Sequence, residues 1–328
     1  MAPVARPAAQ NPRWRFGLLW IVLALAATPN VGCNFSPPIE STAAAAPSAP
    51  SAAVVEPPFV TDVNQPAHVH ESLDVVYVKR GDLELKGDIF VPAGDGPFPG
   101  VLMVHGGAWQ RGSKKRFVPA AKELASHGYT VMSIDYRLAP QFKFPAQLDD
   151  CRDAVRFMRR EAARYKIDPR HVGGCGYSAG GHLVCLLATE DEAAPDPADA
   201  GAGAPISSRL QAVAAGGVPS DFRQFDPDST FLSYWLGGTP RECPEKYRAA
   251  SPRAFVSPDD PPMFLYHGQK DWLVPVLSAE ALVQSLHEAQ VAAELFVVPG
   301  AGHREAQFDP RAIAAALGFL DKTLKPAK

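Results

Sequence analysis

Residues 172–189 read VGGCGYSAGGHLVCLLAT, and Ser178 stands in the middle with Gly176 and Gly180 two positions to either side. The apolar residues before Ser178 indicate a buried strand, and those after it indicate an apolar helix. A sharp strand-to-helix turn forces its central residue into a strained backbone conformation. Side chains two positions away would collide with the neighbouring strand and helix, so glycine is needed there. The stretch therefore predicts a serine raised above the edge of a sheet.

The chain on both sides of this turn alternates apolar runs with helical periods. Strands are predicted, in chain order, over residues 74–80, 83–92, 99–107, 129–136, 171–178, 210–218, 261–268 and 293–300. Helices are predicted over residues 114–127, 147–165 and 179–188, and after each of the last two strands. The first two strands are typical of an antiparallel pair. Continuous apolar runs in the others predict an α/β fold with a mostly parallel central sheet and helices on both faces.

One folded domain is predicted over residues 74–328. Residues 221–260 interrupt the strand-helix alternation with aromatic residues and prolines, so we interpret them as a short insertion after the sixth strand. This insertion follows the carboxyl end of a strand, and ligands bind at that edge in open α/β sheets. Residues 34–73 are rich in Ala and Pro and poor in bulky apolar side chains, which predicts a disordered tether.

The first 33 residues have the pattern of a secretory signal. Three arginines precede the apolar run Phe16–Ala27, which is shorter than the ~20 residues that span a bilayer. Val31-Gly32-Cys33 is similar to the end of a bacterial lipobox, with Asn30 where Leu is usual. We therefore expect an exported cell-envelope protein that is attached to a membrane through lipidated Cys33. The alternative is cleavage to a soluble secreted or periplasmic protein.

Composition excludes several other classes of protein. The 328 residues are 46% hydrophobic and 20% charged with a formal net charge of −3, so no basic excess indicates a nucleic-acid partner. No Cys/His spacing is typical of a zinc site, and neither a metal nor an organic cofactor is expected. Export would permit disulfides, but Cys151 and Cys185 lie on apolar stripes of predicted helices and Cys175 lies in a predicted strand, so four cysteines are predicted to be unpaired thiols. These are Cys151, Cys175, Cys185 and Cys243.

Two further side chains have the positions needed to activate Ser178. A serine hydroxyl becomes a nucleophile when a base removes its proton, and the base must be held in the correct tautomer. Asp271 follows the seventh predicted strand in HGQKDWLVP, and His303 follows the eighth in VPGAGHRE. All three residues therefore belong to one edge of the predicted sheet. Their chain order, Ser–Asp–His, is that of the α/β-hydrolases.

The third predicted strand ends in His105-Gly106-Gly107-Ala108-Trp109. Backbone N–H groups of such a glycine turn can point toward a developing oxyanion. We predict an oxyanion hole formed at Gly106 and Gly107 together with the N–H of Ala179, the residue after the nucleophile.

The remaining polar residues are assigned to other roles. Asp221, after the sixth strand, is the rival acid, whereas Asp259 and Asp260 precede their strand and belong to the opposite end of the sheet. His182, on the helix after the turn, is interpreted as a structural histidine. The rest are predicted to form a structural polar network: Asp135, Tyr136, Arg137, Asp149 and Asp150.

The motifs HGGAW, SIDYRLAP, GYSAGGHL, HGQKDWLVP and VPGAGH together resemble the esterase/lipase group of the α/β-hydrolase superfamily. The resemblance extends from about residue 74 to the end, and it is greatest to the bacterial branch of acetyl-esterase, acetylxylan-esterase and feruloyl-esterase-like enzymes. It implies hydrolysis of carboxylic esters, with Ser178, Asp271 and His303 as the triad. Ala108 replaces the third glycine of the HGGG variant, and Arg304 stands where many relatives have glycine. The first departure is compatible with a backbone donor, and the second leaves the substrate open.

The expected reaction is two-step acyl transfer through an acyl-enzyme, on short-acyl or carbohydrate-linked esters, either small molecules or polysaccharide-linked. Four aromatic residues are candidates for the substrate pocket, with core packing as the alternative: Trp109, Tyr177, Trp235 and Trp272. Two other functions stay open. One is amide cleavage by an arylformamidase-like or peptidase-like relative, and the other is a non-catalytic surface binding module on the same scaffold.

Overall fold

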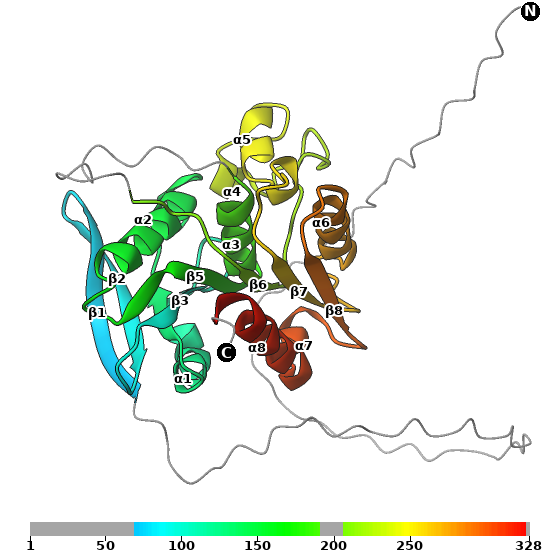
Figure 1. Ribbon diagram of the computed structural model, residues 1–328. Coiled ribbons are helices and arrows are strands. Elements are labelled where there is room, and N and C mark those ends of the chain that lie inside the picture. The colour runs from blue at the N-terminus through cyan, green and yellow to red at the C-terminus, as the bar shows by residue number, and fades with distance from the viewer. Residues whose placement is uncertain (1–68, 191–205, 326–328) are drawn as a thin grey trace, which may run out of the picture. The chain divides into compact units, whose positions relative to one another are not determined.

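The computed structural model describes residues 69–190 and 206–325 (Figure 1). The predicted signal peptide, Cys33 and most of the predicted tether lie outside the described residues. Within the described ranges, no helix is both long enough and apolar enough to cross a bilayer.

An eight-stranded sheet in the order β1-β2-β4-β3-β5-β6-β7-β8 runs through the domain. Its strands are β1 (Val69–Arg80), β2 (Leu83–Pro92), β3 (Phe98–Val104), β4 (Thr130–Ile134), β5 (Ile167–Tyr177), β6 (Val213–Gly216), β7 (Met263–Gly268) and β8 (Ala293–Val298). Strand β2 is antiparallel to both β1 and β4, and all other neighbours are parallel. This arrangement confirms the predicted mostly parallel sheet.

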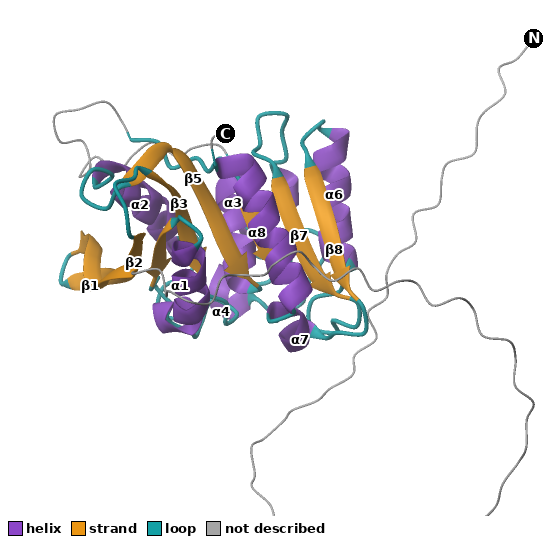
Figure 2. Ribbon diagram, turned by 60° about the horizontal axis from the view of Figure 1, so that its bottom comes forward, coloured by secondary structure: helices purple, strands orange, loops and turns teal. Residues whose placement is uncertain are grey.

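Helices cover both faces of the sheet, as predicted (Figures 1 and 2). They are η1 (Lys114–Phe117), α1 (Val118–Ser126), α2 (Ala146–Arg160), α3 (Ala179–Thr189), α4 (Ser233–Leu236), α5 (Pro244–Ala249), η3 (Pro252–Ala254), α6 (Leu277–Glu288), α7 (His303–Gln307) and α8 (Pro310–Leu324). One buried core joins the sheet to α2, α3 and α6, and a second joins the opposite face to α1 and α8. The insertion after β6 is confirmed and carries α4, α5 and η3.

The predicted boundary between tether and domain is wrong by five residues. Strand β1 begins at Val69, where it pairs with Pro92, so residues 69–73 belong to the sheet. The register shifts between Ser72 and Val75, and Asp74 has φ of +53°. Such an irregular strand lacks the regular alternation of apolar residues that marks a strand in sequence. Backbone pairing with β2 determines its start.

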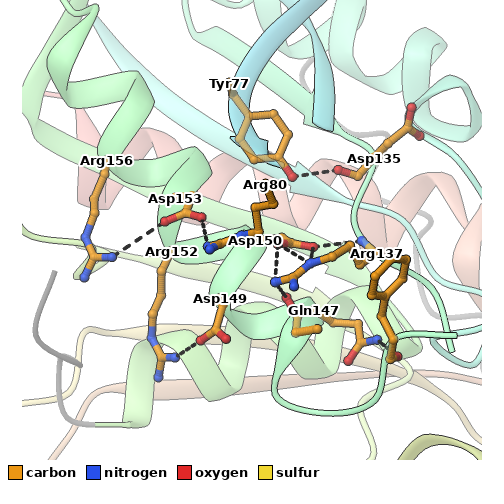
Figure 3. Close-up of polar contacts among 12 residues, drawn as sticks. Tyr77, Arg80, Asp135, Arg137, Gln147, Asp149, Asp150, Arg152, Asp153 and Arg156 are labelled. Atoms are coloured by element: carbon orange, nitrogen blue, oxygen red, sulfur yellow. Dashed lines mark hydrogen bonds and ion pairs between the residues drawn. The ribbon is translucent and has the colours of Figure 1, made fainter. Parts of the chain in front are cut away.

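The structural polar network is confirmed on the side of α2 that faces β1 (Figure 3). Asp150 is fully buried and accepts hydrogen bonds from the backbone and side chain of Arg137. The neighbouring Asp153 pairs with Arg80 of β1, and Asp135 accepts a bond from the backbone N–H of Lys114. The Arg80 and Arg137 contacts fasten the first strand and the loop after β4 to α2, and the Asp135 contact joins that loop to η1.

The four described cysteines are free, as predicted. Burial raises the pKa of the Cys151, Cys175 and Cys185 thiols, so these side chains stay protonated and act as small apolar groups.

Candidate active site

Ser178 lies on the turn between β5 and α3 with φ of 56° and ψ of −123°. Its N–H donates to the carbonyl of Gly216 in the next strand, at 2.8 Å. A Cβ on Gly180 would lie 2.0 Å from the Val104 carbonyl oxygen, and one on Gly176 would lie 2.5 Å from the Gly180 carbonyl. No real side chain makes contacts that short. The two glycines are therefore required by the close approach of strand and helix, which confirms the predicted turn.

Asp271 and His303 form a hydrogen-bonded pair at the ends of β7 and β8. The His303 Nδ1 lies 2.6 Å from Asp271 Oδ2. The other carboxylate oxygen, Oδ1, accepts the N–H groups of Leu273 at 3.0 Å and Val274 at 2.8 Å. Burial opposes ionisation of Asp271, but hydrogen bonds from His267 and His303 outweigh it and hold the pKa of its carboxyl below the usual range. Asp271 is therefore a carboxylate that orients the imidazole.

His267 is a functional contact that the sequence analysis missed. Its Nε2 lies 3.2 Å from Asp271 Oδ2 and 2.8 Å from the Val274 carbonyl oxygen. A carbonyl oxygen only accepts, so Nε2 carries the proton and donates. The ring is fully buried, and its Nδ1 contacts no hydrogen-bond partner among residues 69–190 and 206–325. Its position on β7, four residues before Asp271, is the sequence signal that could have found it.

The imidazole of His303 lies beside the turn that carries Ser178. The hydroxyl of Tyr177, the residue before Ser178, donates to the His303 carbonyl oxygen at 2.6 Å. The two rings are 5.2 Å apart. Directly after β6, a Cβ on Gly217 would lie 3.0 Å from His303 Cε1. Since Ser178 is bonded to Gly216, these contacts bring the histidine and the serine to one place on the sheet edge.

The loop after β3 crosses the same turn. A Cβ on Gly106 would lie 2.6 Å from the Tyr177 carbonyl oxygen and 3.2 Å from Ser178 Cβ. Gly107 has φ of +130° and approaches Arg111 so closely that a Cβ would meet its carbonyl oxygen at 2.0 Å. Ala179 is the first residue of α3. The backbone at Gly106 therefore borders Ser178, Ala179 follows Ser178 directly, and Gly107 is the next residue of the loop that carries Gly106.

Residues 87–286 match the model of the BD-FAE family. The chain belongs to the BD-FAE family. The match includes Ser178 and Asp271, and His303 lies beyond it. The fold is that of the α/β-hydrolases, as the strand order and the turn at Ser178 indicate.

Known relatives of this BD-FAE protein are esterases by name. It is 29% identical over 213 residues to esterase LipC of Mycobacterium tuberculosis. The aligned region covers 63% of this chain and 53% of LipC. The chain thus spans about half the length of the curated relatives it matches. A truncated carbohydrate esterase from gut microbiota has a similar structure, with a TM-score of 0.68, 25% identity, and coverage of 79% of this chain and 98% of that one. The butyrate-bound esterase Est2 of Thermogutta terrifontis gives a TM-score of 0.65, 26% identity, and coverage of 80% and 97%.

The pocket prediction is wrong for three of its four aromatic residues. Trp109 and Trp235 are 5% and 0% exposed and stack face to face with ring centroids 3.8 Å apart. Tyr177 is 2% exposed, and its hydroxyl donates to the His303 carbonyl oxygen. Trp109 and Trp235 fill the core because the insertion folds back over the loop after β3, whereas Tyr177 packs against Tyr266 and His303. No local pattern in the sequence indicates this packing. Trp272, next to Asp271, is 85% exposed.

The rival acid and the structural histidine are settled by their contacts. Asp221 is paired with Arg223 at 2.7 Å and with Arg253 at 3.7 Å, so it does not orient His303. His182 is fully buried and lies between the indole N–H of Trp109 and the Ala250 carbonyl. Burial lowers its pKa to about 4, which keeps it neutral as a structural residue.

The described residues contain no group of three or more His, Cys, Asp or Glu that could hold a metal.

Proposed function

We propose that the protein is a serine esterase that hydrolyses carboxylic esters through an acyl-enzyme. The Asp271–His303 pair beside the strained Ser178 turn is the observation that carries this proposal. An imidazole held by a carboxylate is a general base, and a serine on such a turn is presented to substrate. The names of the relatives, esterase LipC and esterase Est2, support the same reaction.

In the proposed mechanism, His303 Nε2 takes the Ser178 proton while the serine oxygen attacks the ester carbonyl carbon. Asp271 holds the imidazole by Nδ1 and stabilises the imidazolium that forms. Backbone N–H groups at Gly106, Gly107 and Ala179 bind the oxyanion. His303 then protonates the leaving alcohol. Water attacks the acyl-enzyme by the same route and releases the acid together with free Ser178.

The substrate class that we propose is a short-acyl or carbohydrate-linked ester. The insertion holds the short elements α4, α5 and η3, and its Phe222 and Trp235 pack into the core, so it is not built as a large lid. Short chains fit the butyrate and propionate named with Est2, and carbohydrate esters fit the gut carbohydrate esterase. Cleavage of formamides or peptides is the second candidate, but no contact in the site favours it.

The test is hydrolysis of p-nitrophenyl acetate by wild type and by Ser178→Ala. We expect the variant to lose at least ~10³-fold in kcat/KM, because the nucleophile is gone while binding groups stay. Equal rates would refute the proposal. A panel of acetylated sugars, feruloyl esters, aryl formamides and proline peptides then separates ester from amide preference.

For location, we propose export and attachment to a membrane through lipidated Cys33, supported by the basic and apolar pattern of residues 1–33. Membrane and soluble fractions of cells expressing wild type or Cys33→Ala test this. The wild type should sediment with membranes and the variant should not. Identical partitioning of the two would refute the anchor.

A further inference from the structure

The loop after β3 carries stored backbone strain next to Ser178. Ala108 and Trp109 are consecutive residues with φ of +52° and +57°. Each non-glycine residue in this left-handed region costs ~1–3 kcal/mol and persists only when its surroundings hold it there. The two residues directly follow Gly106 and Gly107, the positions proposed to bind the oxyanion. Whatever holds Ala108 and Trp109 therefore also sets the direction of those N–H groups.

Trp109 is held by three contacts. Its carbonyl accepts the N–H of Ala139 at 2.9 Å, and its indole N–H donates to His182 Nδ1 at 3.3 Å. Its ring stacks on that of Trp235 in α4, with 1° between the planes. These contacts locate the indole. The turn around Ala108 and Trp109 also closes on itself, because the N–H groups of Gln110 and Arg111 donate to the Gly107 carbonyl at 3.2 and 3.1 Å.

Ala108 is held by the insertion. The hydroxyl of Tyr234, in α4, donates to the Ala108 carbonyl oxygen at 2.8 Å. The two residues are 126 positions apart in the chain. Tyr234 and Trp235 are neighbours in α4, so one short helix contacts both strained residues of the loop. Burial raises the pKa of Tyr234 to about 12, so its hydroxyl keeps the proton that it donates.

We propose that Tyr234 is a positioning residue for the oxyanion hole. Its hydrogen bond fixes the Ala108 carbonyl, which keeps Ala108 in its left-handed conformation and aims the preceding N–H groups at the substrate carbonyl. The insertion thus acts as a brace, through the Tyr234 hydrogen bond, on the loop after β3 that carries the oxyanion donors. The inference rests on the proposed esterase function, because an oxyanion must form for the brace to act on it.

The first experiment compares Tyr234→Phe with Tyr247→Phe on p-nitrophenyl acetate. Tyr247 is the matched control, because its hydroxyl also donates to a carbonyl of the insertion, that of Gly238 at 3.2 Å. Removing an oxyanion donor costs ~10²–10³ in rate, so misaiming donors that remain should lower kcat about tenfold in Tyr234→Phe, with KM within about twofold. Tyr247→Phe should keep kcat within about twofold.

A second readout separates positioning from general destabilisation. With a trifluoromethyl ketone, Ser178 Oγ bonds to the carbonyl carbon and passes its proton to His303 Nε2, and the carbonyl oxygen becomes an oxyanion in the donor site. The matching methyl ketone binds largely as the neutral ketone. Tyr234→Phe should raise the inhibition constant of the trifluoromethyl ketone by about the factor by which it lowers kcat. The inhibition constant of the methyl ketone should stay within about twofold of the wild-type value. A wild-type-like inhibition constant for the trifluoromethyl ketone would overturn the proposal, as would parallel losses in both tyrosine variants.

A double variant tests the strain itself. Glycine adopts positive φ at no steric cost, so Ala108→Gly should reduce the need for the brace. Ala108→Gly/Tyr234→Phe should lose less kcat relative to Ala108→Gly than Tyr234→Phe loses relative to wild type. Equal losses on both backgrounds would contradict the role of Tyr234 in holding Ala108. An inactive wild type would instead refute the esterase function, so the two failures are distinguishable.

Discussion

At the scale of single residues, Asp271 is the most constrained side chain of the site. Both of its oxygens are occupied: Oδ1 by two backbone N–H groups, and Oδ2 by His303 and His267. Four donors leave the carboxylate one orientation and favour its charged form. The imidazole of His303 is then presented with Nδ1 protonated and Nε2 free to accept. This arrangement makes Asp271, rather than the other acids near the sheet edge, the orienting group.

Asp271→Asn should therefore lower kcat by about 10³–10⁴-fold, because an amide NH₂ facing His303 favours the wrong tautomer. Asp221→Asn is the control, since Asp221 pairs with arginines and should keep kcat within about twofold. The measurement is p-nitrophenyl acetate turnover at pH 8, with circular dichroism to check folding. A larger loss in Asp221→Asn than in Asp271→Asn would overturn the assignment of the acid.

At the scale of elements, the contact between α3 and β3 determines whether the serine is presented. Gly180 brings the first turn of α3 against the Val104 carbonyl, where no Cβ fits. Gly180→Ala should lower the free energy of unfolding by more than about 3 kcal/mol, because backbone must move to admit the methyl group. Gly318→Ala in α8, where a Cβ meets open space, should raise it by up to about 1 kcal/mol. Urea unfolding measures both, and equal effects would contradict the packing described for the turn.

Helix α3 also carries a pH dependence of stability through His182. Its pKa in the folded protein is lowered to about 4, so below pH 6.5 the unfolded chain takes up a proton that the folded one does not. The contribution of neutral His182 to the free energy of unfolding is therefore fully present above pH 6.5. It is lost as the pH falls toward 4, by an amount on the order of 3 kcal/mol. Urea unfolding between pH 7.5 and 4.5 should show a smaller fall for His182→Gln than for wild type. Parallel curves would show that His182 titrates normally in the fold.

The elements with a strong local signal were predictable from sequence. Buried strands such as β3 are continuous apolar runs, and the glycines around Ser178 follow from the steric needs of one turn. The stacking of Trp109 on Trp235 was not predictable, because it joins a loop and an insertion that are far apart in the chain. The same holds for the Tyr234 bond to Ala108. Tertiary contacts of this kind leave no periodic pattern.

At the scale of the whole molecule, the sheet brings distant segments of the chain to one edge. Ser178 follows β5, Asp271 follows β7 and His303 follows β8, and these strands are parallel, so their carboxyl ends share an edge. Chain order and strand position together were enough to predict this convergence. The insertion and the buried network on α2 then hold the loops around it, and neither role is encoded in a local motif.

We propose that this convergence turns the Ser178 hydroxyl into a nucleophile, and labelling with a fluorophosphonate is the test of that reactivity. The serine oxygen displaces fluoride from phosphorus, and intact-protein and peptide mass spectrometry count and locate the adduct. We expect one adduct per chain, on Ser178, which is absent in Ser178→Ala and forms far more slowly in His303→Ala. An unlabelled wild type, an adduct at another residue, or equal labelling rates in wild type and His303→Ala would contradict it.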